Sequence, residues 1–150
     1  MLADCRKPSL ALSSLGMVLA LLTSASAYSC EQLAFDEPWI REPPPVSRVA
    51  AGYVSISNTS EHDIEISGVE SSCCEHVMIH ETLIENGEAR MRHRDKLTIS
   101  AKSELVLAPL GTHMMLMGVH ATLENGEELE LVFSCGSENR SAVIFPVLKR

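Results

Sequence analysis

Positive charge is scarce in this sequence of 150 residues, which has 12 lysine and arginine residues against 20 aspartate and glutamate residues. The formal net charge is −8 at pH 7. A protein that binds the phosphate backbone of nucleic acids needs a basic surface, and no basic stripe occurs along this chain. The composition therefore argues against nucleic-acid binding, and it disfavours acidic substrates for the same reason.

Long hydrophobic runs are also lacking. The longest, Leu10–Leu22, is shorter than the roughly 20 residues that a membrane-spanning helix needs. Basic residues precede this run, and small residues follow it up to Ala27. This pattern predicts a secretory signal peptide over residues 1–27, cleaved after Ala27, and an exported product. Lipid attachment at Cys30 is the less favoured alternative, because the bulky Tyr28 lies where small or aliphatic residues are usual.

Familiar catalytic signatures are missing as well. The sequence has no defensible Ser-His-Asp order, glycine-rich phosphate loop or pair of catalytic carboxylates, so we expect a protein that is not an enzyme. The adjacent cysteines Cys73 and Cys74 motivate one alternative, an exported thiol-disulfide oxidoreductase that maintains the cysteines of a copper protein. Such enzymes typically use a C-x-x-C pair, which is absent here.

What the sequence does contain is a series of short strand patterns separated by turn residues. After the signal peptide no amphipathic helix of useful length is recognisable, and residues 28–150 have room for one domain. About eight or nine short strands at turn-marked intervals predict an all-β fold, a Greek-key β-sandwich. Pro38 and Pro146 indicate edge strands or bulges, because proline lacks a backbone donor.

One hairpin can be predicted with its register. Asn86-Gly87 lies between two strand patterns and is a strong signal for a two-residue turn. With that turn, His80 faces His93 and Thr82 faces Met91, so His80 and Met91 are diagonal neighbours roughly 7–8 Å apart at the backbone. A longer loop would change the register, and a slip of one residue would place the two side chains on opposite faces.

A second group of donors lies in the segment Gly111–Gly118, which we interpret as a loop. His113 and Met115 are two residues apart and project to the same side of an extended segment. Met114 and Leu116 then face the core, and Met117 at the end is also assigned to packing. Imidazole and thioether groups together are the donors that copper(I) prefers, whereas structural zinc sites recruit thiolates and imidazoles.

The spacing of these donors resembles that of the periplasmic copper(I) chaperones called PCuAC. Ten residues separate His80 from Met91, and twenty-one more precede His113-Met114-Met115. The flanking segments Trp39-Ile40-Arg41 and Ala51-Gly52-Tyr53 are similar too, and the resemblance covers roughly residues 33–148. It implies a cupredoxin-like β-sandwich in which His80, Met91, His113 and Met115 bind one Cu(I).

The same resemblance implies what such a protein does with its ion. A non-enzymatic chaperone would deliver Cu(I) to a cuproprotein acceptor such as a cytochrome c oxidase subunit, which allows peripheral contact with membrane proteins. The four cysteines after the signal peptide depart from the PCuAC pattern. A second alternative is an interaction sandwich that binds no metal.

Two questions stay open at this stage. His76, Met78 and His93 are either auxiliary donors or simply polar positions on an exposed hairpin. Four cysteines allow three complete pairings. A Greek-key sandwich commonly sets its first and last strands side by side, which favours a Cys30–Cys135 bridge, but Cys73 and Cys74 remain possible partners for either residue.

Overall fold

The computed structural model describes residues 29–136 and 138–150, so the predicted signal peptide and its cleavage point lie outside the described residues. Within them the chain forms one short 3-10 helix and eleven strands. No helix in this part of the chain is long and apolar enough to cross a membrane. The elements are η1 (Cys30–Gln32), β1 (Leu33–Arg41), β2 (Val49–Asn58), β3 (Ile64–Ile66), β4 (Gly68–Glu70), β5 (His76–Glu85), β6 (Glu88–Arg94), β7 (Leu97–Ile99), β8 (Glu104–Leu107), β9 (Thr112–Met117), β10 (Glu128–Cys135) and β11 (Asn139–Leu148).

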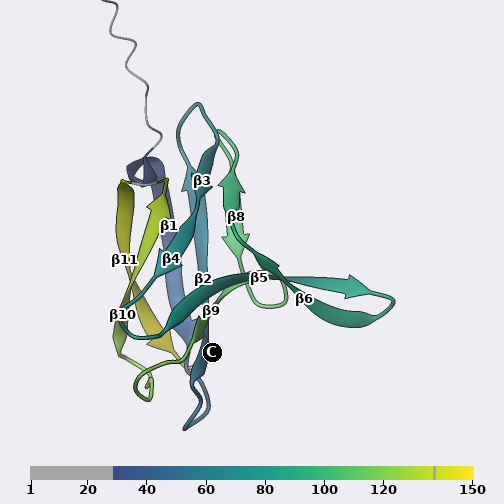
Figure 1. Ribbon diagram of the computed structural model, residues 1–150, viewed down its shortest axis with the longest axis vertical. Coiled ribbons are helices and arrows are strands. Elements are labelled where there is room, and N and C mark those ends of the chain that lie inside the picture. Colours follow the sequence, from purple (N-terminus) through teal and green to yellow (C-terminus); the bar gives the residue numbers. More distant parts are fainter. Residues whose placement is uncertain (1–28, 137) are drawn as a thin grey trace, which may run out of the picture.

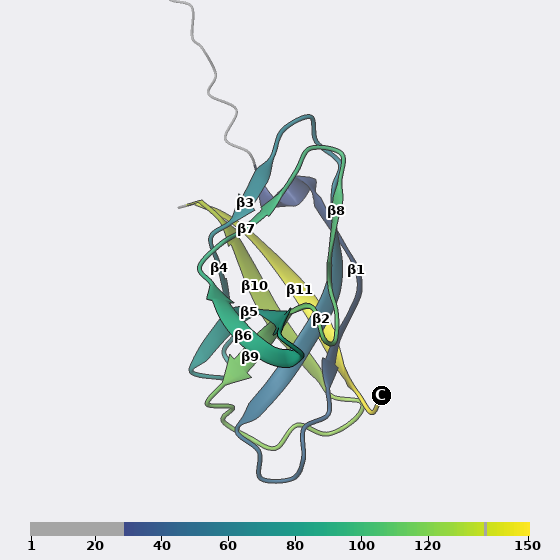
Figure 2. The same ribbon diagram turned by 90° about the vertical axis from the view of Figure 1, so that its right-hand side faces the viewer.

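Most strands belong to one large sheet with the order β4-β10-β11-β1-β2-β9-β5-β6 (Figure 1). β8 and β9 pair with the same edge of β2: β9 pairs with its first half and β8 with its second half. β3 pairs with β7 in a separate small sheet. The sheet folds back on itself, so that β4 also contacts β5, and the turned view shows β5, β6 and β9 in front of β10 and β11 (Figure 2). This is the predicted all-β sandwich.

The core lies between these layers and follows the alternation of the strands. Along β9, Met114 and Leu116 are fully buried, while the side chains between them point to the other face. The largest fully buried side chains come from both ends of the chain: Phe133, Phe145, Ile40, Ile56, Ile64, Ile66, Ile99, Leu107, Met114, Leu116, Leu131 and Val54. Segments far apart in sequence therefore share one hydrophobic interior.

The structure differs from the predicted strands in three places. Eleven strands form in the described residues rather than eight or nine. The pattern at residues 63–69 breaks at Ser67, and β3 and β4 then join different sheets. Gly111–Gly118 is not a loop: its residues 112–117 form β9, paired with β2 on one side and with β5 on the other.

The two prolines behave differently. Pro38 lies at a bulge in β1, where the register shifts between Asp36 and Trp39, as predicted. Pro146 was expected at a sheet edge, and this prediction is wrong, because β11 lies between β10 and β1. The parallel pairing with β1 begins at Val147, one residue after the proline, so the missing donor interrupts no bond of that ladder.

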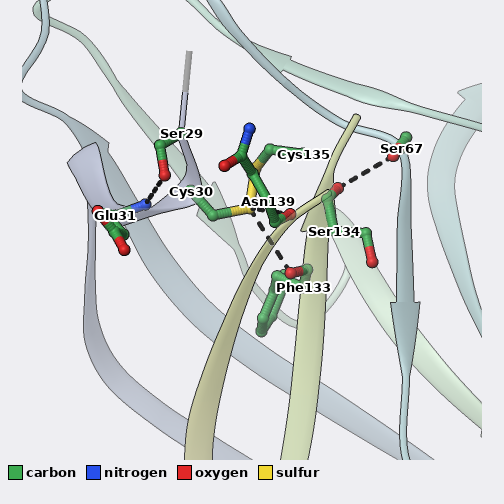
Figure 3. Close-up of a disulfide and its surroundings, with 8 residues drawn as sticks. All are labelled: Ser29, Cys30, Glu31, Ser67, Phe133, Ser134, Cys135 and Asn139. Carbon is green, nitrogen blue, oxygen red and sulfur yellow. Dashed lines mark hydrogen bonds between the residues drawn. A yellow bond between two sulfur atoms is a disulfide. The ribbon is translucent and has the colours of Figure 1, made fainter. Parts of the chain in front are cut away.

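A disulfide joins Cys30 to Cys135, with their Cα atoms 5.4 Å apart (Figure 3). It links η1, just before β1, to the last residue of β10. The predicted Cys30–Cys135 bridge is thus confirmed. While its sulfur is bonded to Cys135, the Cys30 side chain is not available for a thioether-linked lipid.

Candidate metal centre

Three histidines lie side by side on neighbouring strands. His80 on β5 faces His113 on β9 and, on its other side, His93 on β6. The ring centroids of His80 and His113 are 6.2 Å apart, and those of His80 and His93 are 5.7 Å apart. His80 occupies the short stretch of β5 that is paired with both neighbours, so it lies at the centre of the row.

Aromatic side chains close one end of this row. The ring centroid of Tyr53 on β2 is 6.5 Å from that of His113, and Trp39 on β1 stacks on Tyr53 at 4.5 Å. The guanidinium of Arg41 lies 5.9 Å from both of these ring centroids. His113 is therefore only 6% exposed, although it lies on the face opposite the core residues Met114 and Leu116.

The predicted methionines lie at unequal positions. Met115 follows His113 on the same face of β9 and is half-buried opposite Met78. Met91 on β6 faces Thr82 on β5, which confirms the predicted hairpin register and makes Met91 a diagonal neighbour of His80. Met91 is 65% exposed and lies on an edge strand. The structure thus brings His80, His113 and Met115 together on adjacent strands, with Met91 one strand farther out.

The hydrogen bonds of the histidines define which nitrogens remain available. His113 Nδ1 lies 2.9 Å from the Gly111 carbonyl oxygen, to which it donates, so the lone pair is on Nε2. His80 Nδ1 is buried and has no hydrogen-bond partner in the part of the chain that the structure describes. Burial lowers the pKa of His80, and the neighbouring His113 and His93 lower it further. His80 is therefore held as the neutral imidazole, the form that binds metals.

The donor set determines which class of ion this face can hold. Among residues 29–136 and 138–150, no three histidine, cysteine, aspartate or glutamate side chains are arranged to hold a metal ion. A metal here would need thioether sulfur as well as imidazole nitrogen. Such a mixed set suits a soft ion and does not suit calcium, magnesium or structural zinc.

Comparison with known families decides which group the chain belongs to. Residues 33–147 match the family model described as "Putative lipoprotein LpqE-like". The chain belongs to the LpqE-like family. A related sequence, "Putative lipoprotein Lxx21020" from Leifsonia xyli subsp. xyli (strain CTCB07), is 33% identical over 102 residues, 67% of this chain. The LpqE-like chain spans 61% of the length of that relative.

Solved structures similar to this LpqE-like protein are PCuAC domains. The copper-bound PCuAC domain from PmoF2 superposes with a TM-score of 0.68 at 19% identity, covering 82% of this chain and 97% of that one. The solution structure of CuI-DR1885 from Deinococcus radiodurans gives a TM-score of 0.66 at 27% identity, covering 84% of each chain. The resemblance to PCuAC and the predicted cupredoxin-like β-sandwich are confirmed.

Sequence reasoning missed part of the donor face of this LpqE-like protein. Met117 was assigned to packing, but it is half-buried and lies opposite His76, on the same face as His113 and Met115. For His93, whose role the sequence left open, the structure gives a polar partner: its Nε2 atom lies 3.2 Å from Asp95 Oδ1. The sequence did contain a signal for Met117: if His113 and Met115 project to one face of a strand, the same period of two places residue 117 on that face.

Two cysteines in the described part of this LpqE-like chain lie outside the disulfide. Cys73 and Cys74 are free, and Cys74 is buried. Burial, with a smaller contribution from Cys73, raises the pKa of the Cys74 thiol to about 12. A thiol with so high a pKa holds almost no thiolate at neutral pH, and thiolate is the nucleophile in disulfide exchange. The raised pKa speaks against Cys74 as the attacking thiol that the oxidoreductase alternative would need.

Proposed function

We propose that this protein is a periplasmic copper(I) chaperone that binds one Cu(I) tightly through His80, Met91, His113 and Met115. Its cargo is the ion itself, and no reaction is catalysed. The fold that it shares with PCuAC domains supports this proposal, because the structures of that fold include a copper-bound domain and a Cu(I) form of DR1885.

The single observation that carries the proposal is the buried Nδ1 atom of His80. A buried polar atom without a partner costs roughly 1–3 kcal/mol. His80 nevertheless keeps this atom buried, in a row with His113 and diagonal to Met91. A bound cation supplies the partner that the nitrogen lacks, and the lowered pKa of His80 keeps the ring from competing for a proton instead.

The surrounding charges fit a carrier of a small cation. Neutral imidazole and thioether donors leave the charge of Cu(I) uncompensated, and the net charge of −8 provides a surface that attracts cations or a basic docking partner. On the hairpin, an ion pair joins Arg94 to Glu81 at 2.8 Å, so these two charges largely cancel. The field of the whole acidic protein is then the main electrostatic attraction.

The proposed acceptor is a copper centre of cytochrome c oxidase, reached by peripheral contact with that membrane protein. This part of the proposal is supported by the PCuAC resemblance. A chaperone must hold its ion against competitors and still release it by ligand exchange. The arrangement of a buried His113 with an exposed Met91 meets both needs, because one side of the site stays fixed while the other is open to an incoming ligand.

Replacing Met91 and Met115 together by leucine is expected to abolish tight Cu(I) binding. Leucine conserves the volume of methionine and removes only the sulfur donor. In an anaerobic titration against a high-affinity Cu(I) chelator, we expect the unmodified protein to retain one equivalent and the double variant to retain none. Retention of that equivalent by the double variant would refute the ligand assignment.

Met114→Leu is the matched control for this experiment. Met114 lies between the proposed ligands on the same strand, but it is fully buried on the core face. We expect this variant to retain the tight equivalent. Loss of binding in Met114→Leu would show that any methionine replacement on β9 disturbs the site indirectly.

A further inference from the structure

The pairing of β5 with β9 places three more soft donors beside the proposed site. We propose that His76, Met78 and Met117 form a second, weaker Cu(I) position on the same face. This inference rests on the proposed function, because it extends the same cargo and the same face by a set of residues that the first site does not use.

Its geometry follows from the strand register. Three consecutive cross-strand pairs on this face consist entirely of histidine and methionine: His80 with His113, Met78 with Met115, and His76 with Met117. Directly opposed side chains have Cβ atoms roughly 4.5–5.5 Å apart. His76 and Met117 therefore face each other closely, and Met78 is the next side chain along β5 on that face.

The second position is separate from the first. Residues two apart on a strand lie about 6.6–6.8 Å from each other along its axis. The His76–Met117 pair is two such steps from the His80–His113 pair, about 13 Å away. One ion cannot contact both pairs, so donors at this end serve a second ion or none.

Packing does not account for these side chains. The methionine that fills the core from β9 is Met114, which is 0% exposed and points to the opposite face. Met78 and Met117 are half-buried, and His76 is exposed. All three side chains are at least partly exposed to solvent, and methionine has enough rotatable bonds for its sulfur to turn toward an ion there.

The chemistry of the set selects the same class of ion as the first site. Two thioethers and one imidazole are neutral, soft donors, and Cu(I) accepts such low-coordinate sets. The flanking charges nearly cancel, because Glu75 is paired with Arg48 at 3.2 Å. With three donors, one of them on an exposed side chain, this position binds less tightly than the first. It would fill only after the first ion is bound.

Methyl NMR of methionine tests the inference residue by residue. In protein labelled with 13C at the methionine methyl groups, Cu(I) is added anaerobically up to four equivalents, so that binding at the Cys73 and Cys74 thiols cannot hide a later event. We expect the methyl signals of Met91 and Met115 to shift with the first equivalent and that of Met117 to shift only with later ones. We also expect the Met78 methyl signal to shift with the later equivalents. His76→Gln combined with Met117→Leu should remove this later shift of the Met78 signal, whereas Met114→Leu should leave it in place.

The outcomes separate the two proposals. If the Met91 and Met115 signals shift but the Met117 signal stays unchanged at saturation, the second position is refuted and the first site stands. If the Met117 signal shifts while those of Met91 and Met115 do not, the proposed ligand set of the first site fails and a Cu(I) position at His76 and Met117 remains. A later shift of the Met78 methyl signal that persists in the double variant also refutes the second position.

Discussion

Replacing Cys30 and Cys135 together by serine is expected to lower the free energy of unfolding by about 2–5 kcal/mol. The bridge closes a loop with a sequence separation of 105 residues, nearly the whole domain. In the chain-entropy model, a loop of about 100 residues corresponds to roughly 4.7 kcal/mol. Denaturation by urea, followed by circular dichroism, measures the change.

Cys73→Ser is the control for this prediction, since it removes a half-buried cysteine that takes no part in the bridge. We expect its stability to stay within about 1 kcal/mol of the unmodified protein. Reduction of the unmodified protein should reproduce the effect of the double variant. Equal stability of the double variant and Cys73→Ser would contradict a stabilising role for the bridge.

The same double variant should keep its tight Cu(I) equivalent at temperatures where it is folded. The bridge lies next to the Leu33 end of β1, whereas the histidine row adjoins the Trp39 end of that strand. At about 3.3 Å per residue, these two ends are roughly 20 Å apart. Stability and metal binding are therefore expected to respond separately, and their joint loss in the folded protein would mean that the bridge also shapes the site.

His113→Ala is expected to weaken Cu(I) binding by more than the 10–100-fold that loss of a supporting hydrogen bond typically costs at a metal site. The variant removes a proposed donor whose orientation is fixed by the hydrogen bond from Nδ1 to the Gly111 carbonyl oxygen, at 2.9 Å. Competition with a chromophoric Cu(I) chelator gives the affinity. A second variant, His80→Ala, should show a comparable loss.

The control histidine is His62, which is exposed in the turn between β2 and β3. His62→Ala should keep the affinity of the unmodified protein. Because His113 is buried, its replacement can also destabilise the fold, so circular dichroism must accompany the measurement. If His80→Ala is folded and binds Cu(I) with unchanged affinity, the imidazole part of the site is wrong.

The hairpin shows how much of the site the sequence could predict. Asn86-Gly87 defined a two-residue turn, and the period of two along a strand then determined every pair from His80–His93 to Thr82–Met91. The Cys30–Cys135 bridge was likewise predictable, because a Greek-key sandwich brings the first and last strands together. Local turn chemistry defined the hairpin register, whereas general topology only favoured this bridge among the three possible pairings.

Other features depend on contacts between distant segments, which no local pattern records. The segment that forms β9 was interpreted as a loop bounded by two glycines, yet pairing with both β2 and β5 makes it a central strand. The same pairing places Met117 opposite His76. The position of Pro146 depended on β1 joining β11 only beyond the proline. In all three cases, the strands that pair with the segment determine its place in the sheet.

The β5–β6 hairpin extends away from the rest of the sandwich (Figure 1), and every side chain of β6 is exposed. Few core contacts hold such an element, so it can open locally at a small fraction of the global unfolding free energy. For a carrier this sets an order of events. In the proposed site, Met91 would be the ligand with the shortest residence time, and an acceptor would replace it first, while His113 and Met115 on the central strand would keep the ion until the transfer is complete.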